Sequence, residues 1–90
     1  MGNKEEAQMH FERGMSLYSR NRYSEAVTEF SEAIRLYPDG AGVYCNRGTA
    51  YGQLGRYSEA IADFEKALQL DPSNDDCIHN IAITKRARGW

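Results

Sequence analysis

Apolar residues recur along the chain at spacings of three and four, which is the period of an amphipathic α-helix. Two segments show it most clearly, each with small side chains and one ring on the same predicted face: Ala26, Phe30 and Ala33, and later Ala60, Phe64 and Ala67. Small side chains let two helix axes approach closely, while the ring fills the space one turn along. Gly14 and Gly48 lie in the helical patterns that precede these segments, which indicates close packing there as well. The pattern predicts an all-α fold.

Residues that end helices stand at equivalent places in the two halves of the chain. Asn21 and Gly55 are the residue types that best tolerate the left-handed conformation closing a helix, so each is predicted to end a first helix. Pro38 and Pro72 are predicted to end the second helices, because proline forces the preceding residue out of helical geometry. Two helix pairs with tight turns are therefore expected.

Polar residues mark the expected helix starts. Asn3 is expected to cap the first helix, with Glu6 three residues on to answer it. Ser24 and Ser58 are expected at the start of the two second helices, where a serine hydroxyl can cap the backbone. Ser73 is expected to cap a last helix whose apolar face consists of Ile78, Ile81 and Ala82.

The chain repeats itself with a period of 34 residues. Residues 7–40 form the first unit and 41–74 the second. Residues 75–90 form either a closing helix or a truncated third unit, with Asn80 in register with Asn46, and the sequence leaves these two readings open. The identical pairs are Ala7/Ala41, Arg13/Arg47, Gly14/Gly48, Arg22/Arg56, Tyr23/Tyr57, Ser24/Ser58, Glu25/Glu59, Ala26/Ala60, Phe30/Phe64, Ala33/Ala67, Leu36/Leu70 and Pro38/Pro72.

Composition and charge exclude several classes of protein. The 90 residues are 41% hydrophobic and 27% charged, which is typical of a folded globular domain, and no apolar run is long enough to cross a membrane. The net charge of -2 provides no basic field for nucleic acid. We expect neither a nucleic-acid nor a membrane partner. The chain's first residues lack the apolar run of a secretory signal, so a cytoplasmic location is expected.

Candidate chemistry is sparse. Cys45 and Cys77 are the only cysteines, and we interpret them as small buried residues or free thiols in preference to a disulfide. His10 is expected to be a half-buried substitute for an aromatic residue. Cys45 could face His79 across neighbouring helices, but nothing supplies an oxyanion site, and two ligands are too few for structural zinc. We expect no enzyme, no metal and no cofactor. The basic cluster of Lys85, Arg86 and Arg88 is interpreted as a solvated helix end, and Trp90 either folds back over the last helix or is loose.

The second unit resembles the tetratricopeptide repeat in nearly all of its pattern residues: Tyr44, Gly48, Tyr51, Gly55, Tyr57, Ala60, Phe64, Ala67 and Pro72. The first unit departs from the pattern at His10, where an aromatic residue is usual, and at Leu17, which stands in place of tyrosine. The resemblance implies a right-handed solenoid of antiparallel helix pairs, here five helices forming one domain over 1–90. It also implies a concave groove, lined by the first helix of each unit, that binds other proteins or short peptides.

The resemblance also implies which residues of this chain would line the groove. Its wall would carry Gln8, Phe11, Glu12, Met15 and Tyr18 from the first unit, Cys45, Asn46, Thr49 and Gln53 from the second, and His79, Asn80 and Ile83 from the closing helix. Either these residues bind a peptide, or Phe11 and Met15 pack on their own surroundings and the asparagines merely solvate the wall.

The family's best-known ligand mode holds a peptide's terminal carboxylate, and this chain lacks its cations. That mode needs two lysines, two asparagines and an arginine, where this chain has Phe11, Met15, Asn46, Asp76 and Asn80. The leading hypothesis is therefore a scaffold that binds a peptide segment of a partner protein without a charged carboxylate clamp. The alternative is a structural protein that self-assembles as a homodimer through its terminal helix.

Overall fold

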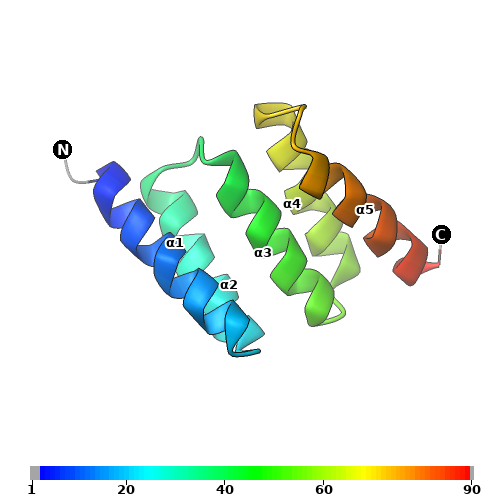
Figure 1. Ribbon diagram of the computed structural model, residues 1–90, viewed down its shortest axis with the longest axis horizontal. Coiled ribbons are helices and arrows are strands. Elements are labelled where there is room, and N and C mark those ends of the chain that lie inside the picture. Colours follow the sequence, from blue (N-terminus) through cyan, green and yellow to red (C-terminus); the bar gives the residue numbers. More distant parts are fainter. Residues whose placement is uncertain (1–2, 90) are drawn as a thin grey trace.

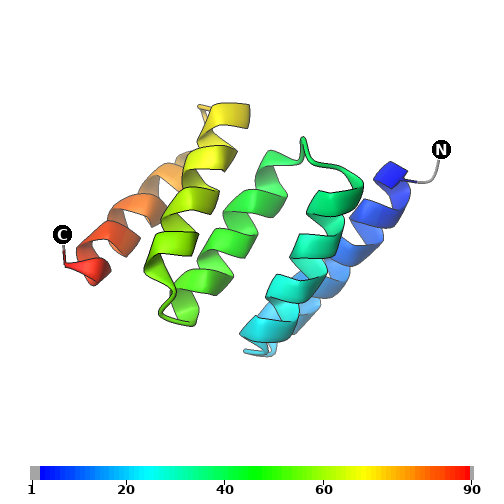
Figure 2. The same cartoon turned by 180° about the vertical axis from the view of Figure 1, so that it is seen from behind.

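A computed structural model of the chain describes residues 3–89, which form five α-helices joined by short turns (Figure 1). The helices are α1 (Asn3–Ser19), α2 (Tyr23–Leu36), α3 (Ala41–Gln53), α4 (Tyr57–Leu70) and α5 (Asp75–Arg88). α1, α3 and α5 form one layer, nearer the viewer in Figure 1, and α2 and α4 form the layer behind, which faces the viewer in Figure 2. The predicted all-α helical solenoid is confirmed.

The predicted left-handed helix ends are confirmed. Asn21 has a φ of 62°, Gly55 a φ of 77° and Gly89 a φ of 88°. These three residues are spaced by 34, so α1, α3 and α5 end in the same way. α2 and α4 each end two residues before the predicted proline. Their C-cap residues, Tyr37 and Asp71, are no longer in a helical conformation. The interpretation of Trp90 as a cover for the last helix falls on a residue outside 3–89.

The starts of α2 and α4 differ from the prediction. Each begins one residue before its serine, and no side chain caps it. Instead, Arg22 before α2 pairs with Glu25 at 2.6 Å, and Arg56 before α4 pairs with Glu59 at 2.6 Å. The carboxylates therefore serve both the helix dipole and an arginine. The prediction that Ser24 and Ser58 cap these helices is therefore wrong.

The start of α5 also needs a correction. Its cap is Asn74, whose side-chain oxygen accepts a hydrogen bond from the backbone nitrogen of Cys77 at 3.1 Å. Ser73 lies one residue too early and donates its hydroxyl to Asp71 at 2.8 Å instead. Both residue types are good caps, and the structure selects the one adjacent to the helix.

Two rings and two glycines hold the helix pairs together. A Cβ placed on Gly14 would lie 2.5 Å from the ring of Phe30, and one placed on Gly48 would lie 2.8 Å from the ring of Phe64. Both rings are almost fully buried. The close approach predicted from the small residues is confirmed, and it accounts for a glycine inside each first helix despite its cost in helix propensity.

A buried ion pair joins three helices. Arg47 of α3 donates to both carboxylate oxygens of Asp63 in α4, at 2.7 Å each, and to the hydroxyl of Ser31 in α2 at 3.1 Å. The hydrogen bonds to Asp63 raise the pKa of the Arg47 guanidinium further above its ordinary value, because they favour its charged form. This network locks the second unit onto the first.

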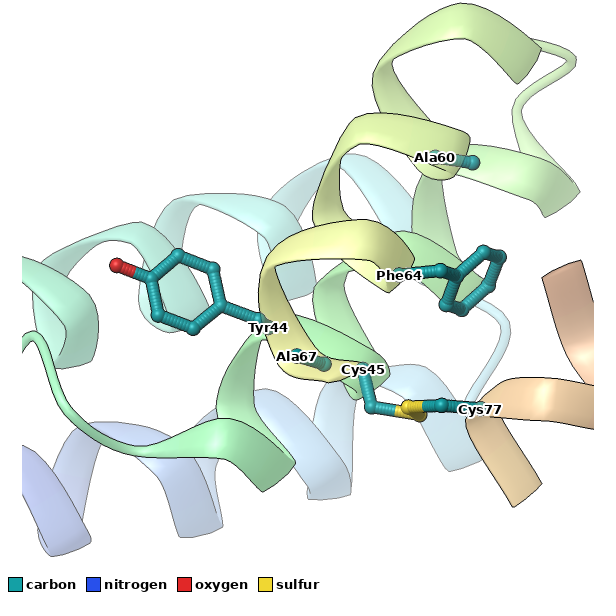
Figure 3. Close-up of a cluster of buried hydrophobic side chains, with 6 residues drawn as sticks. All are labelled: Tyr44, Cys45, Ala60, Phe64, Ala67 and Cys77. Atoms are coloured by element: carbon teal, nitrogen blue, oxygen red, sulfur yellow. A yellow bond between two sulfur atoms is a disulfide. The ribbon is translucent and has the colours of Figure 1, made fainter. Parts of the chain in front are cut away.

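Cys45 of α3 and Cys77 of α5 form a disulfide, with their Cα atoms 5.7 Å apart (Figure 3). The interpretation as free thiols is therefore wrong. Both cysteines are buried in the core cluster around Phe64. The bond joins α5 to α3 across a sequence separation of 32, so the closing helix is cross-linked to the first helix of the second unit. The cytoplasmic location expected from the sequence stays a prediction.

Candidate functional site

A hollow of about 280 Å³ opens between α3 and α5 and reaches the first residue of α4. Its lining combines amide and hydroxyl groups with a glycine and exposed aliphatic side chains: Thr49, Gly52, Gln53, Tyr57, Asn80, Ile83, Thr84 and Ala87. The disulfide fixes the two helices that form its walls. We refer to this hollow as the α3/α5 groove.

The polar groups of the α3/α5 groove are partly committed to each other. Asn80 donates to the Thr49 hydroxyl at 3.4 Å, and Thr84 donates to the backbone oxygen of Asn80 at 2.8 Å. Thr49 in turn donates to the backbone oxygen of Cys45 at 3.0 Å. Within residues 3–89 no group donates to the side-chain oxygen of Asn80, so this oxygen is available to a ligand's N–H group.

None of the side chains that line the α3/α5 groove is a carboxylate, lysine, arginine or histidine. Ile83 is 48% exposed there and offers an apolar contact beside the amide of Asn80. A surface of this kind has hydrogen-bonding groups for a peptide backbone and an apolar surface for a side chain, without a partner for an isolated charge.

Four of the residues that the sequence assigned to the binding surface come together in this groove: Thr49, Gln53, Asn80 and Ile83. The first-unit residues lie elsewhere. Phe11 packs on Phe30, with ring centroids 5.9 Å apart, and belongs to the core of the first unit. Tyr18 packs edge-on against Tyr23 and accepts a long hydrogen bond of 3.4 Å from Gln53. Met15 is 41% exposed and lines no part of the groove.

The three remaining assigned residues of the second unit and the closing helix do not line the groove either. Cys45 is buried in the disulfide, so it can neither contact a ligand nor act as a nucleophile beside His79. Asn46 donates its amide to the backbone oxygen of Gly42 at 2.9 Å. His79 is exposed on α5 outside the hollow.

Family models match most of the chain. One described as "Tetratricopeptide repeat" matches residues 41–74, and one described as "TPR repeat" matches residues 14–55. The chain belongs to the tetratricopeptide repeat family. Its members are non-enzymatic interaction modules, and the chain has their fold of stacked helix pairs. A search of curated protein sequences finds no match.

Solved tetratricopeptide repeat domains superpose closely on the chain. The Arabidopsis OM64 TPR domain is 29% identical with a TM-score of 0.94, and the match covers 96% of this chain and 71% of that domain. The second TPR domain of human RPAP3, solved with an HSP70 peptide, is 32% identical with a TM-score of 0.86, covering 88% and 66%. The yeast Sti1 TPR2B domain in its pHsp70 complex is 30% identical with a TM-score of 0.85, covering 97% and 67%. The chain thus spans about two thirds of these relatives.

Sequence reasoning missed half of the groove lining. Thr84 and Ala87 follow Asn80 at helical spacing, so extending the Asn80 face by one and two turns would have found them. Gly52 follows Thr49 by three residues on α3, so the same extension of the Thr49 face would have found it. Tyr57 is the first residue of α4, and no pattern in the repeat marked it as a groove residue.

A second hollow of about 250 Å³ lies on the first unit, at the face between α1 and α2, and its lining is charged: Arg13, Ser16, Leu17, Arg20 and Glu29. Glu29 also bonds to His10 at 2.7 Å, and His10 is half-buried as predicted. This hollow differs in charge from the α3/α5 groove, so ligands of the two would differ.

Within residues 3–89, no group of three or more histidine, cysteine, aspartate or glutamate side chains could hold a metal ion. None of the helices in the described part combines the length and the apolar character needed to cross a bilayer.

Proposed function

We propose that this tetratricopeptide repeat chain binds an extended peptide segment of a partner protein in the α3/α5 groove, by reading its backbone and an uncharged side chain. The observation that carries the proposal is the lining of the groove, where Asn80 offers a free side-chain oxygen next to the exposed Ile83 and no charged group is present. Extended peptides present alternating N–H and C=O groups, which amides and hydroxyls can satisfy.

The relatives support the general role. Human RPAP3 holds an HSP70 peptide in its second TPR domain, and the yeast Sti1 TPR2B domain forms a complex with pHsp70. The RPAP3 ligand, SGPTIEEVD, is acidic. The α3/α5 groove has no cation to receive such a peptide's carboxylates, so we propose a ligand of different charge.

The five clamp positions support this distinction. Phe11 is packed against Phe30, and Met15 has no donor group. Asp76 lies exposed on α5 and would repel a carboxylate. Asn46 and Asn80 can donate hydrogen bonds but carry no charge, so neither can neutralise a peptide's carboxylate as a lysine or arginine would.

A matched pair of variants on α5 tests the groove. Ile83 is 48% exposed in the groove, and Ile78 is 46% exposed outside it. Peptides selected from an array by the wild-type chain should bind Ile83→Asp at least about tenfold more weakly, a loss of about 1.4 kcal/mol. They should bind Ile78→Asp with unchanged affinity. Peptides that bind both variants as well as the wild type would refute the groove assignment.

A further inference from the structure

The face of α5 that points away from the groove is uncovered, although the same face is covered on α1 and α3. His10 of α1 forms a hydrogen bond with Glu29 of α2. At the equivalent position of α3, Tyr44 is 9% exposed and belongs to the core cluster that includes Phe64 of α4. The next position in this register, 34 residues on, is Ile78, and it is 46% exposed. Figure 1 shows α5 at the end of the array, with α4 on its inner side.

The small residue of this face is also in register. Gly14 and Gly48 are the points at which the rings of α2 and α4 approach most closely. Ala82 is the third member of that series, again spaced by 34, and it is exposed. α5 therefore presents the same surface on which α2 packs against α1 and α4 packs against α3. Within residues 3–89, no helix packs on this surface of α5.

The charges along this face indicate which helix fits. Asp75, Ile78, Ala82 and Lys85 lie at helical spacings of three, four and three, share one side of α5 and are all exposed. In order along the helix they are an acid, a large apolar group, a small apolar group and a base. We call these four residues the α5 stripe.

The α5 stripe is complementary to itself in the antiparallel direction. A twofold axis midway between Ile78 and Ala82 places Ile78 of one copy opposite Ala82 of the other. The same axis places Asp75 opposite Lys85, and each contact occurs twice, as an isologous interface requires. In the parallel direction, like charges would face each other.

We propose that two copies of this chain pair through the α5 stripe as an antiparallel helix dimer. The apolar centre of the stripe drives association, and the charges at its ends set the direction. The groove residues Asn80 and Ile83 lie on a different side of α5, so the dimer keeps both grooves open. This inference does not depend on the proposed peptide function.

Sedimentation velocity of the chain over a wide concentration range tests the dimer. The wild type is expected to associate, Ile78→Asp to raise the dissociation constant at least tenfold, and Ile83→Asp to leave it unchanged. A wild type that stays monomeric up to about 1 mM would overturn the proposal, because even a weak specific interface associates at that concentration. An Ile78→Asp variant that dimerises like the wild type would overturn it as well.

A charge exchange tests the direction. Asp75→Lys and Lys85→Asp each bring like charges together in the antiparallel dimer, so each variant alone should associate more weakly than the wild type. An equal mixture should recover association as a heterodimer, because the new base at position 75 of one variant then faces the new acid at position 85 of the other, and the unchanged Lys85 of the first faces the unchanged Asp75 of the second. Circular dichroism checks that both variants fold. Failure of the mixture to recover association would rule out the antiparallel register.

Discussion

Arg47 of α3 holds Asp63 of α4 with two parallel hydrogen bonds of 2.7 Å each. The side chain of Asp63 is 7% exposed, and that of Arg47 is 20% exposed. Arg47 also lies 5.6 Å from the ring centroid of Tyr51 and reaches Ser31 of α2. A pair placed in this way contributes chiefly by satisfying charges that the fold has already buried.

Breaking one side of this pair should therefore cost more than removing both. Asp63→Leu leaves the Arg47 guanidinium without its carboxylate and should lower the free energy of unfolding by about 3 kcal/mol. Adding Arg47→Met should recover most of that loss, because no buried charge then remains. Urea denaturation measures both variants. A single variant that costs less than about 0.5 kcal/mol would show that the pair is solvated like a surface salt bridge.

Two glycines in the same helix should respond to alanine with opposite signs. Gly48→Ala places a Cβ 2.8 Å from the Phe64 ring and 3.0 Å from the backbone oxygen of Ala60, and should destabilise the chain by about 1–3 kcal/mol. Gly42→Ala meets nothing within 4 Å and should stabilise it by about 0.5 kcal/mol through helix propensity. Thermal unfolding compares them, and equal shifts would contradict the close packing described for Gly48.

The disulfide should make stability depend on redox conditions. Reduction of Cys45–Cys77 releases a loop with a sequence separation of 32 and should cost about 3 kcal/mol. A loss of that size lowers Tm on the order of 15 °C in a domain of this length. The control is the double variant Cys45→Ala/Cys77→Ala, whose Tm should not respond to dithiothreitol. A wild type whose Tm is the same in both conditions would mean that the bond adds nothing to stability.

The terminal carboxylate of a bound peptide should matter little. A peptide selected by the wild-type chain should bind with an affinity that changes less than about twofold, or 0.4 kcal/mol, when its carboxyl terminus is amidated. The reason is that Asn80 and the other groove residues supply no cation. Isothermal titration of the free and amidated forms measures this directly. A loss of tenfold or more on amidation would show that the chain uses a carboxylate clamp after all.

Much of the fold could be predicted because the sequence repeats it. The left-handed ends at Asn21 and Gly55 and the packing of Phe30 and Phe64 all follow from residue types at equivalent places. The helix starts were harder. Arg22 and Glu25 carried the relevant signal at a spacing of three, but serine's general preference for caps pointed to the neighbouring residue.

Contacts between units could not be predicted in the same way. Cys45 and Cys77 are 32 residues apart, and only the stacking of α5 on α3 brings their Cα atoms to 5.7 Å. Its register predicts Phe11 in the groove, yet its ring packs against Phe30 in the core of the first unit. The position of a residue in the repeat predicts which helix carries it, but does not by itself predict the direction of its side chain.

The most direct test of peptide binding in the α3/α5 groove is an NMR titration of the isotope-labelled chain with a selected peptide. Binding in this groove should produce amide shift changes centred on Thr49, Gln53, Asn80 and Thr84, on the two helices that line it. Shift changes centred instead on Arg13, Ser16 and Arg20, in the charged hollow of the first unit, would contradict it.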